Sequence, residues 1–444
     1  MATIPSSRGW RVFGVVWGGQ LVSLVGSGLT TFVLGLWVYQ QTQSVTQFAL
    51  ILLSGALPRI LFSPLAGVLS DRWDRRWLML LSDAGAGLSV LAVALLYFAH
   101  HLAVWQIYLV TALGAACNAF QFPAYVAVTT LLVPSRQLGR VNGLLQLGLA
   151  AQDVLSPPIA GLLIATLQIG GVLLIDVCTF MFAVLTLLLV RFPATPATAE
   201  GQAGRGSVRD ELLSGWTYIA RRPGLFGLLL FYAATSFLSG MIAALIYPLV
   251  LTFASATALS LVIAVAGGGM LLSSLVMSAW RGPQRRVVGV LAGEAIFGIG
   301  LMLIGLCPVI PLIALGAFIA HISLPLSYVT NQAIWQAKVA PDAQGRVFAI
   351  RQMVGRAAAP LAYLLAGPLA DGIFNPLFAA HGPLAGNVGR LLGVGPGRGI
   401  GLIFVLMGAL ALALTGIGML SPRLRLVEQE IPDASEAPLV AASV

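Results

Sequence analysis

The sequence predicts an all-α membrane protein with twelve transmembrane helices in two six-helix repeats. Of the 444 residues, 58% are hydrophobic and only 9% are charged, whereas a soluble domain carries roughly 25% charged residues. Apolar windows recur from end to end, and each is about 20 residues long, the length that crosses a hydrocarbon core about 30 Å thick. Short sequence patterns also recur between the two halves of the chain.

The apolar stretches define six predicted spans in each half of the chain. They cover residues 11–40, 46–70, 77–99, 103–132, 139–167, 170–190, 224–253, 257–280, 287–307, 309–338, 344–370 and 400–420. We therefore expect four parts: an N-terminal half (1–190), a linker (191–223), a C-terminal half (224–420) and a tail (421–444). The linker is rich in Pro, Ala and Gly and then becomes charged, which predicts a short amphipathic helix before the second half.

The basic residues indicate orientation rather than nucleic-acid binding. The net charge is +9, but the Lys and Arg residues lie in short connections between spans, and 19 of the 24 fall on one side. The positive-inside rule then predicts a multi-pass protein of the cell inner membrane, with both termini and the linker in the cytoplasm. The three cysteines lie within spans, and the four histidines show no metal-ligand spacing. We expect no metal and no cofactor.

Two patterns repeat between the halves in the same order. The segment VPSRQLGRVNG (133–143) matches APDAQGRVFA (340–349), with GRV shifted by 206 residues. The segment RWDRR before the third span is echoed by RGPQRR (281–286), shifted by 210 residues. Two six-helix repeats of the same orientation are typical of transporters, because such halves can rock about a central site.

A cluster of charge follows the second span in GVLSDRWDRRWL (67–78). The layout and this loop resemble the major facilitator superfamily over about residues 10–420, and most of all its efflux branch of macrolide exporters, siderophore exporters and lysophospholipid transporters. The family's loop runs G-x-x-x-D-[RK]-x-G-[RK]-[RK]. Here its positions are occupied by Gly67, Asp71, Arg72, Arg75 and Arg76, and Asp74 replaces the second glycine.

Two interpretations of this loop stay open. A solvated loop that obeys the positive-inside rule explains the arginines but not the carboxylates, which contribute little to topology. The alternative is a cytoplasmic gate, in which Asp71 attracts the positive N-terminus of a helix in the other half. The resemblance implies that this partner is the eleventh helix, which begins near Gln344–Arg346. The arginines would add charge-assisted hydrogen bonds.

Ionisable residues inside spans are costly and mark functional sites. Arg59, Asp153 and Arg356 are predicted to lie near the middle of their spans. A carboxyl group in a low dielectric takes up a proton readily, so Asp153 is a candidate for proton coupling, with Arg59 or Arg356 as partner. The alternative is a static ion pair that ties helices together. For Asp83, Asp176 and Glu294, which lie nearer to span ends, we expect contact with the interface or capping of a neighbouring backbone.

The segment after Asp153 resembles the antiporter motif G-P-x-x-G-G of efflux members. Ser156, Pro157, Pro158 and Gly161 occupy the motif, with Ser in place of the first Gly and Ala in place of the penultimate Gly. Two prolines remove backbone donors and bend a helix. We expect this bend where the halves slide against each other.

The resemblance implies that helices 1, 4, 7 and 10 line a central cavity. A largely apolar cavity with scattered amides and aromatic rings suits an amphiphilic ligand, although single Asn and Gln residues also join helices to one another. The arginine that many drug exporters carry in helix 4 is missing. The deep polar residues of these four helices are Gln20, Asn118, Gln121, Tyr232, Ser236, His321, Tyr328 and Asn331.

The sequence thus predicts a secondary transporter rather than an enzyme, because the glycine-rich segment GVGPGRGIG (393–401) lacks the Lys-Ser/Thr of a P-loop. The leading hypothesis is a monomeric exporter of a small amphiphile, such as a drug, macrolide or siderophore-like compound, by proton antiport with alternating access. Its partners would be the substrate, protons and membrane lipid. The alternatives are a lysophospholipid flippase or uncoupled facilitator, and a membrane receptor that does not transport.

Overall fold

The computed structural model describes residues 6–133, 137–190, 208–280, 283–339, 343–379, 382–384, 386 and 389–430. These residues form helices and short connections, with no strand among them. Eleven of the helices are long and apolar enough to cross a membrane. These observations confirm the predicted all-α membrane fold. Helices suit a membrane because they satisfy their backbone hydrogen bonds internally.

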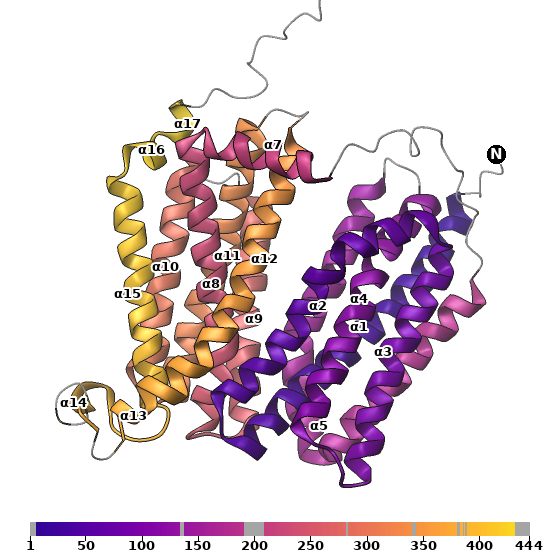
Figure 1. Cartoon of the computed structure of the whole chain (residues 1–444), viewed down its shortest axis with the longest axis horizontal. Helices are drawn as coiled ribbons and strands as arrows, with labels where there is room; N and C mark the ends of the chain where they lie inside the picture. Colours follow the sequence, from indigo (N-terminus) through magenta and orange to yellow (C-terminus); the bar gives the residue numbers. More distant parts are fainter. Residues whose placement is uncertain are drawn as a thin grey trace, which may run out of the picture. The chain divides into compact units, whose positions relative to one another are not determined.

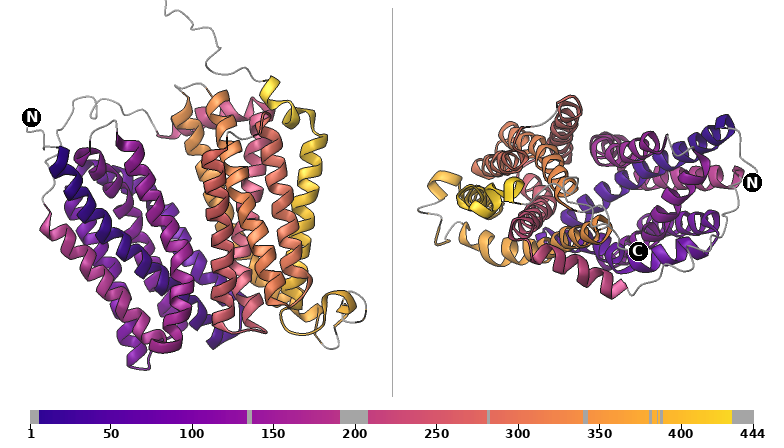
Figure 2. Two further views of the ribbon diagram at one scale, coloured as in Figure 1. Left: turned by 180° about the vertical axis from the view of Figure 1, so that it is seen from behind. Right: turned by 90° about the horizontal axis from the view of Figure 1, so that it is seen from above.

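The chain divides into two compact units (Figures 1 and 2). The first comprises Met1–Ala197 and Ser255–Ala264, and the second comprises Thr198–Ala254 and Val265–Val444.

The first unit is built on five long helices. Their bounds are α1 Ser6–Thr42, α2 Val45–Arg72, α3 Arg75–Phe98, α4 Val104–Leu132 and α5 Leu138–Leu189. The most extensive packing joins α1 to α5, α2 to α4, and α3 to both α4 and α5. With 52 residues, α5 has more than twice the roughly 20 residues that one membrane span requires. It breaks at Gln168, whose φ of 54° is not helical, so α5 contains the fifth and sixth predicted spans.

The second unit contains six long helices and several short ones, and Figure 1 labels them. The long ones are α8 Pro223–Leu251, α9 Ala256–Ala279 (of which residues 256–264 belong to the first unit), α10 Arg286–Leu306, α11 Ile310–Lys338, α12 Gln344–Gly367 and α15 Arg398–Leu420. A π-helix, η2 (Pro368–Phe374), continues α12 directly. The short helices are α7 Val208–Ala220, α13 Asn375–Leu377, α14 Gly389–Leu392, α16 Pro422–Arg425 and α17 Val427–Glu430.

Small residues allow the helices of the second unit to pack closely. A Cβ atom at Gly300 of α10 would lie 2.5 Å from the backbone nitrogen of Ala320 in α11, and one at Gly408 of α15 would lie 2.5 Å from the carbonyl oxygen of Gly298 in α10. Glycine interfaces of this kind are the usual means by which helices associate in lipid, where the burial of apolar surface provides little driving force for association. They place α10 between α11 and α15.

Short helices cover one end of the second unit, where Figure 1 shows α7, α16 and α17. The amphipathic helix expected in the linker is present as α7, which packs on α12. Glu428 of α17 accepts a 3.1 Å hydrogen bond from the backbone nitrogen of Val287, in the first turn of α10, and its carbonyl oxygen accepts one of 2.5 Å from Lys338. The segment after the last span is therefore fixed to the ends of α10 and α11.

Candidate functional site

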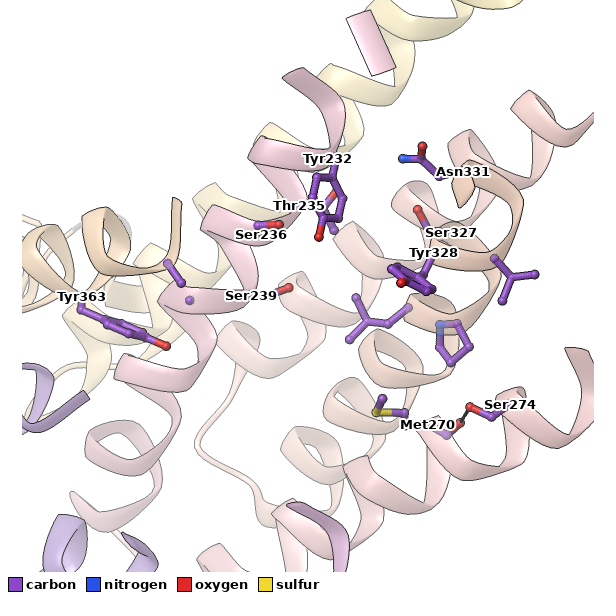
Figure 3. A pocket seen from close by; sticks show the side chains of 15 residues that line it. Tyr232, Thr235, Ser236, Ser239, Met270, Ser274, Ser327, Tyr328, Asn331 and Tyr363 are labelled. Carbon is purple, nitrogen blue, oxygen red and sulfur yellow. Dashed lines mark hydrogen bonds between the residues drawn. The ribbon is translucent and has the colours of Figure 1, made fainter. Parts of the chain in front are cut away.

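A pocket lies within the second unit. Its volume of about 540 Å³ is within the range of small-molecule sites. Its walls are apolar and carry hydroxyl and amide groups but no charged side chain. Figure 3 shows tyrosine and serine side chains from facing helices around the space. The lining residues are Tyr232, Thr235, Ser236, Ser239, Gly240, Met270, Ser274, Leu324, Pro325, Ser327, Tyr328, Val329, Asn331, Ala359 and Tyr363.

Helical spacing explains which residues face this space. On α8, Tyr232, Ser236 and Ser239 follow one another at intervals of four and three residues, so they share one face. On α11, Tyr328 and Asn331 are three residues apart and likewise share one face. Four of the residues expected in a cavity, Tyr232, Ser236, Tyr328 and Asn331, are brought together here.

Sequence reasoning missed Thr235, Ser239, Ser274 and Tyr363 in this lining. Tyr363 lies on α12 and Ser274 on α9, whereas the prediction drew cavity residues only from helices 1, 4, 7 and 10. For Thr235 and Ser239 a signal was present, because they follow Tyr232 and Ser236 by three residues each.

The other four residues expected in a cavity do not line this pocket. Gln20 of α1 and Gln121 of α4 are buried in the first unit, where Gln20 donates a 2.7 Å hydrogen bond to Asp83 of α3 and Gln121 donates one of 2.5 Å to Gln20. Asn118 donates to the Gly114 carbonyl of its own helix. His321 makes a 2.9 Å contact with the Ala317 carbonyl, also in its own helix.

Asp83, Asp176 and Glu294 are buried and bond side chains, whereas the sequence predicts contact with the interface or capping of a neighbouring backbone. Their exposed fractions are 5%, 0% and 1%, and each bonds a neutral side chain. Glu294 of α10 accepts a 2.7 Å hydrogen bond from Thr235 of α8, and Asp176 accepts one of 3.2 Å from Thr179. Asp83 and Glu294 each lie eight residues after the first residue of their helices, α3 and α10, so the two repeats carry a carboxyl group at the same depth.

The coupling candidates are arranged differently from these buried carboxyl groups. Asp153 of α5 is exposed on its helix and interacts electrostatically with Arg59 of α2, which is exposed as well. Arg356 is exposed on α12 in the second unit. Within the first unit, Arg59 is thus the cation whose charge acts on Asp153.

The helix-5 motif packs against α1 and α9. The Ser156 hydroxyl is fully buried and donates a 2.9 Å hydrogen bond to the carbonyl oxygen of Val25 in α1. Pro157 and Pro158 lie inside α5. A Cβ atom at Gly161 would lie 2.1 Å from the Ser260 hydroxyl in the part of α9 that belongs to the same unit. Ser156 thus serves a helix contact at the position where the motif has glycine.

The charged loop connects α2 to α3. Gly67 lies within α2, and the side chains of Asp71 and Arg72 fall outside the described part of the structure. Asp74, which replaces the motif's second glycine, is the N-cap of α3 and accepts a 2.8 Å hydrogen bond from the backbone nitrogen of Arg76. A carboxylate is well suited to that position because the first N–H groups of a helix have no partner within the helix.

Two arginines expected in the gate have partners within their own units. Arg76 donates to the carbonyl oxygens of Leu187 and Leu188 at the end of α5, at 3.2 and 2.7 Å. Arg346, in the first turn of α12, is exposed and donates a 3.3 Å hydrogen bond to Ser214 of α7. Arg75 is the first residue of α3. Arg76 therefore has a structural role at a helix end.

The sequence profile described as Major Facilitator Superfamily matches residues 16–363, which is most of the chain. The chain belongs to this superfamily. It is therefore a multi-pass membrane transporter and not an enzyme.

Named relatives and solved structures agree with this membership. The chain is 30% identical to macrolide efflux protein A of Streptococcus pyogenes, over 84% of this chain and 94% of that protein. It is 24% identical to the multidrug efflux pump Tap of Mycolicibacterium fortuitum, over 79% and 87% of the two chains. A bacterial homologue of the human lysosomal transporter Spinster shares the fold, with a TM-score of 0.67 and 14% identity over 92% of this chain and 96% of that one.

Proposed function

We propose that this protein exports small amphiphilic compounds, of the drug and macrolide type, by proton antiport with alternating access. The observation that carries the proposal is the 30% identity to macrolide efflux protein A along 94% of that protein's length. The pocket in the second unit supports it, since apolar walls receive a hydrophobic skeleton while hydroxyl groups of Tyr232, Ser236 and Tyr328 bond its oxygen and nitrogen atoms. One chain acts alone, with both termini in the cytoplasm.

Proton coupling is assigned to Asp153. Its carboxylate interacts with Arg59, and protonation would abolish that attraction between α2 and α5. A carboxylate with a cationic partner changes its interactions more on protonation than one held by neutral donors, such as Asp83. Arg356, which is exposed on α12, is the second cation that the ionised carboxylate can attract during the cycle.

We propose that the cytoplasmic gate uses the residues of the charged loop other than Arg76. Asp71 and Arg72 remain its centre, at the C-terminal end of α2, with Gly67 one turn earlier. Arg75 and Arg346 stand at helix starts, where they can add charge-assisted hydrogen bonds. Arg76 is left out of the moving contacts because it already bonds two carbonyl groups at the end of α5.

Transport in inside-out vesicles tests export and coupling together. An imposed proton gradient should drive uptake of a fluorescent amphiphile or a labelled macrolide, and a protonophore should abolish it. Asp153→Asn should lose gradient-driven uptake while it retains exchange of labelled for unlabelled substrate. Gradient-driven uptake that persists in Asp153→Asn would overturn the assignment of coupling to this residue. Absence of uptake for every amphiphile would count against export itself.

A matched pair of variants on α9 tests the pocket. Ser274 lines the pocket and Ser278, one turn later, does not. Ser274→Trp should reduce uptake by filling the space, whereas Ser278→Trp should leave it near the wild-type level. Equal uptake by the two variants would show that the pocket is not part of the transport route.

A further inference from the structure

Arg351 places a positive charge among buried side chains, next to Tyr232 of the pocket wall. It lies in the second turn of α12 and is only 5% exposed. Its Cζ atom lies 4.7 Å from the ring centre of Tyr232 and 5.6 Å from that of Trp335. Arginine remains protonated in proteins, so the second unit encloses a permanent cation.

The guanidinium of Arg351 lacks an anionic hydrogen-bond partner within the described part of the chain. One of its nitrogens, Nη1, donates to the neutral side-chain oxygen of Gln332. Its Nε and Nη2 atoms are buried with no hydrogen-bond partner, and the indole nitrogen of the adjacent Trp335 is in the same condition. Buried donors are nearly always paired in proteins, and a buried charge without a counter-charge is costly. These N–H groups of Arg351 and Trp335 therefore form a cluster of buried donors without an acceptor.

The same face of α12 carries both this cation and part of the pocket lining. Arg351, Gly355, Ala359 and Tyr363 recur every four residues, so they lie along one side of the helix. Ala359 and Tyr363 line the pocket. The ring of Tyr232 lies against Gly355, where a Cβ atom would be 2.3 Å from the ring carbon Cε1.

The guanidinium contacts a residue of the pocket wall. Tyr232 lines the pocket on α8, and Tyr328 lines it on the facing helix α11. The face of the Tyr232 ring holds the guanidinium by a cation–π contact, and the same side chain lines the pocket. One side chain therefore contacts both the cation and the pocket.

We propose that Arg351 is an anion-binding subsite of the pocket, and that the preferred substrate is an amphiphile with one acidic headgroup, a carboxylate or a phosphate. This inference rests on the proposed function, because it names the substrate class of the same pocket. The headgroup accepts hydrogen bonds from Nε and Nη2 of Arg351, a two-pronged geometry that suits carboxylate and phosphate. The indole N–H of Trp335 is a further donor. The apolar part of the ligand lies along the pocket walls.

Binding of two amphiphiles that differ only in charge tests the subsite. The probes are a fluorescent dodecanoic acid and its methyl ester, titrated onto the full-length protein in nanodiscs of phosphatidylcholine. The wild type should bind the acid about ten- to a hundredfold more tightly than the ester, the size of a hydrogen-bonded charge pair. Arg351→Gln should bind both probes alike. Arg351→Lys, which keeps the charge but loses the two-pronged geometry, should show an intermediate ratio.

Arg286→Gln is the matched control. Arg286 is exposed in the same unit and donates to the carbonyl oxygen of Ala333, outside the pocket. This variant should retain the wild-type preference for the acid. A monodisperse elution profile establishes that each variant is folded before its ratio is measured.

Each outcome separates this inference from the proposed function. If the wild type binds the ester and the acid equally, or if Arg351→Gln keeps the preference, the subsite is wrong while the amphiphile pocket stands. If neither probe binds, the pocket assignment fails, and the subsite fails with it. Inorganic phosphate is the third probe. If it stabilises the wild type against heat but not Arg351→Gln, while acid and ester bind equally, the site takes a free anion and the headgroup assignment is wrong.

Discussion

The side-chain amide of Gln20 in α1 donates a 2.7 Å hydrogen bond to the buried carboxyl group of Asp83 in α3. Gln121 of α4 in turn donates a 2.5 Å hydrogen bond to the side-chain oxygen of Gln20. Three helices of the first unit are thereby joined through one chain of polar groups in an otherwise apolar interior. Such a series of hydrogen bonds stabilises the protein only when every polar group in it has a partner, because an unpaired polar group in low dielectric is costly.

Removal of the acceptor at Asp83 should destabilise the protein. In Asp83→Leu the amide of Gln20 loses its acceptor, so we expect a loss of about 1–3 kcal/mol in the free energy of unfolding. Asp83→Asn retains a side-chain oxygen at the same place and should lose less. Thermal unfolding of the detergent-solubilised protein, followed by tryptophan fluorescence, measures both. A Leu variant as stable as the wild type would show that this chain of hydrogen bonds contributes nothing to stability.

Exchange of charges distinguishes proton coupling from a static ion pair at Asp153 and Arg59. A static pair should tolerate the double variant Asp153→Arg/Arg59→Asp, because the opposite charges still meet. Coupling requires a carboxyl group on α5, so we expect the double variant to fold but to lose proton-driven uptake. The measurement is vesicle uptake at equal amounts of inserted protein. Full recovery of uptake in the double variant would favour the static pair.

Close packing between α10 and α11 should be sensitive to one methyl group. At Gly300 a Cβ atom would meet the backbone of Ala320 and Gly316 at 2.5 and 2.7 Å, and backbone cannot move aside, so Gly300→Ala should cost about 1–3 kcal/mol. At Gly268 of α9 no atom lies within 4 Å of the same position. Gly268→Ala should be neutral or slightly stabilising, because alanine favours helix. Unfolding temperatures of the two variants check the contrast, and equal values would contradict it.

The segment after the last span should stabilise the second unit through Glu428. Its carboxylate accepts the hydrogen bond of a backbone N–H in the first turn of α10, at Val287, which is the role of a helix cap. Glu428→Ala should therefore cost about 0.5–2 kcal/mol. Glu430→Ala, two residues later in α17, is the control and should cost less. Chemical denaturation in detergent measures the difference, and a larger loss in the control would refute the capping role.

Much of the fold was predictable from hydropathy, because the membrane imposes the length and the helical form of each span. The predicted start of the eleventh span at residue 344 coincides with the first residue of α12, Gln344. The gap predicted between the spans 139–167 and 170–190 coincides with the non-helical residue Gln168 of α5. The π-helix η2 after α12 was not predicted, because its apolar residues continue the pattern of the span before it.

The candidate site was only partly predictable. Polar residues such as Tyr232 and Asn331 were identifiable because they are rare in apolar spans. Which of them would meet was not, because that depends on how each helix is rotated about its axis. Gln20 and Gln121 had the same sequence signature as Asn331, yet they bond one another and Asp83 instead of lining the pocket.

The sequence by itself determined that the chain is a helical membrane protein and how its spans repeat, because these follow from composition and from patterns along the chain. Its loop motif resembles the superfamily to which the chain belongs. The tertiary structure alone decided that Asp83 and Glu294 are buried with neutral partners, that Asp74 caps a helix, and that Arg351 lies beside the pocket. The physical reason is that burial and pairing depend on helix rotation and close packing, which join residues far apart in the chain.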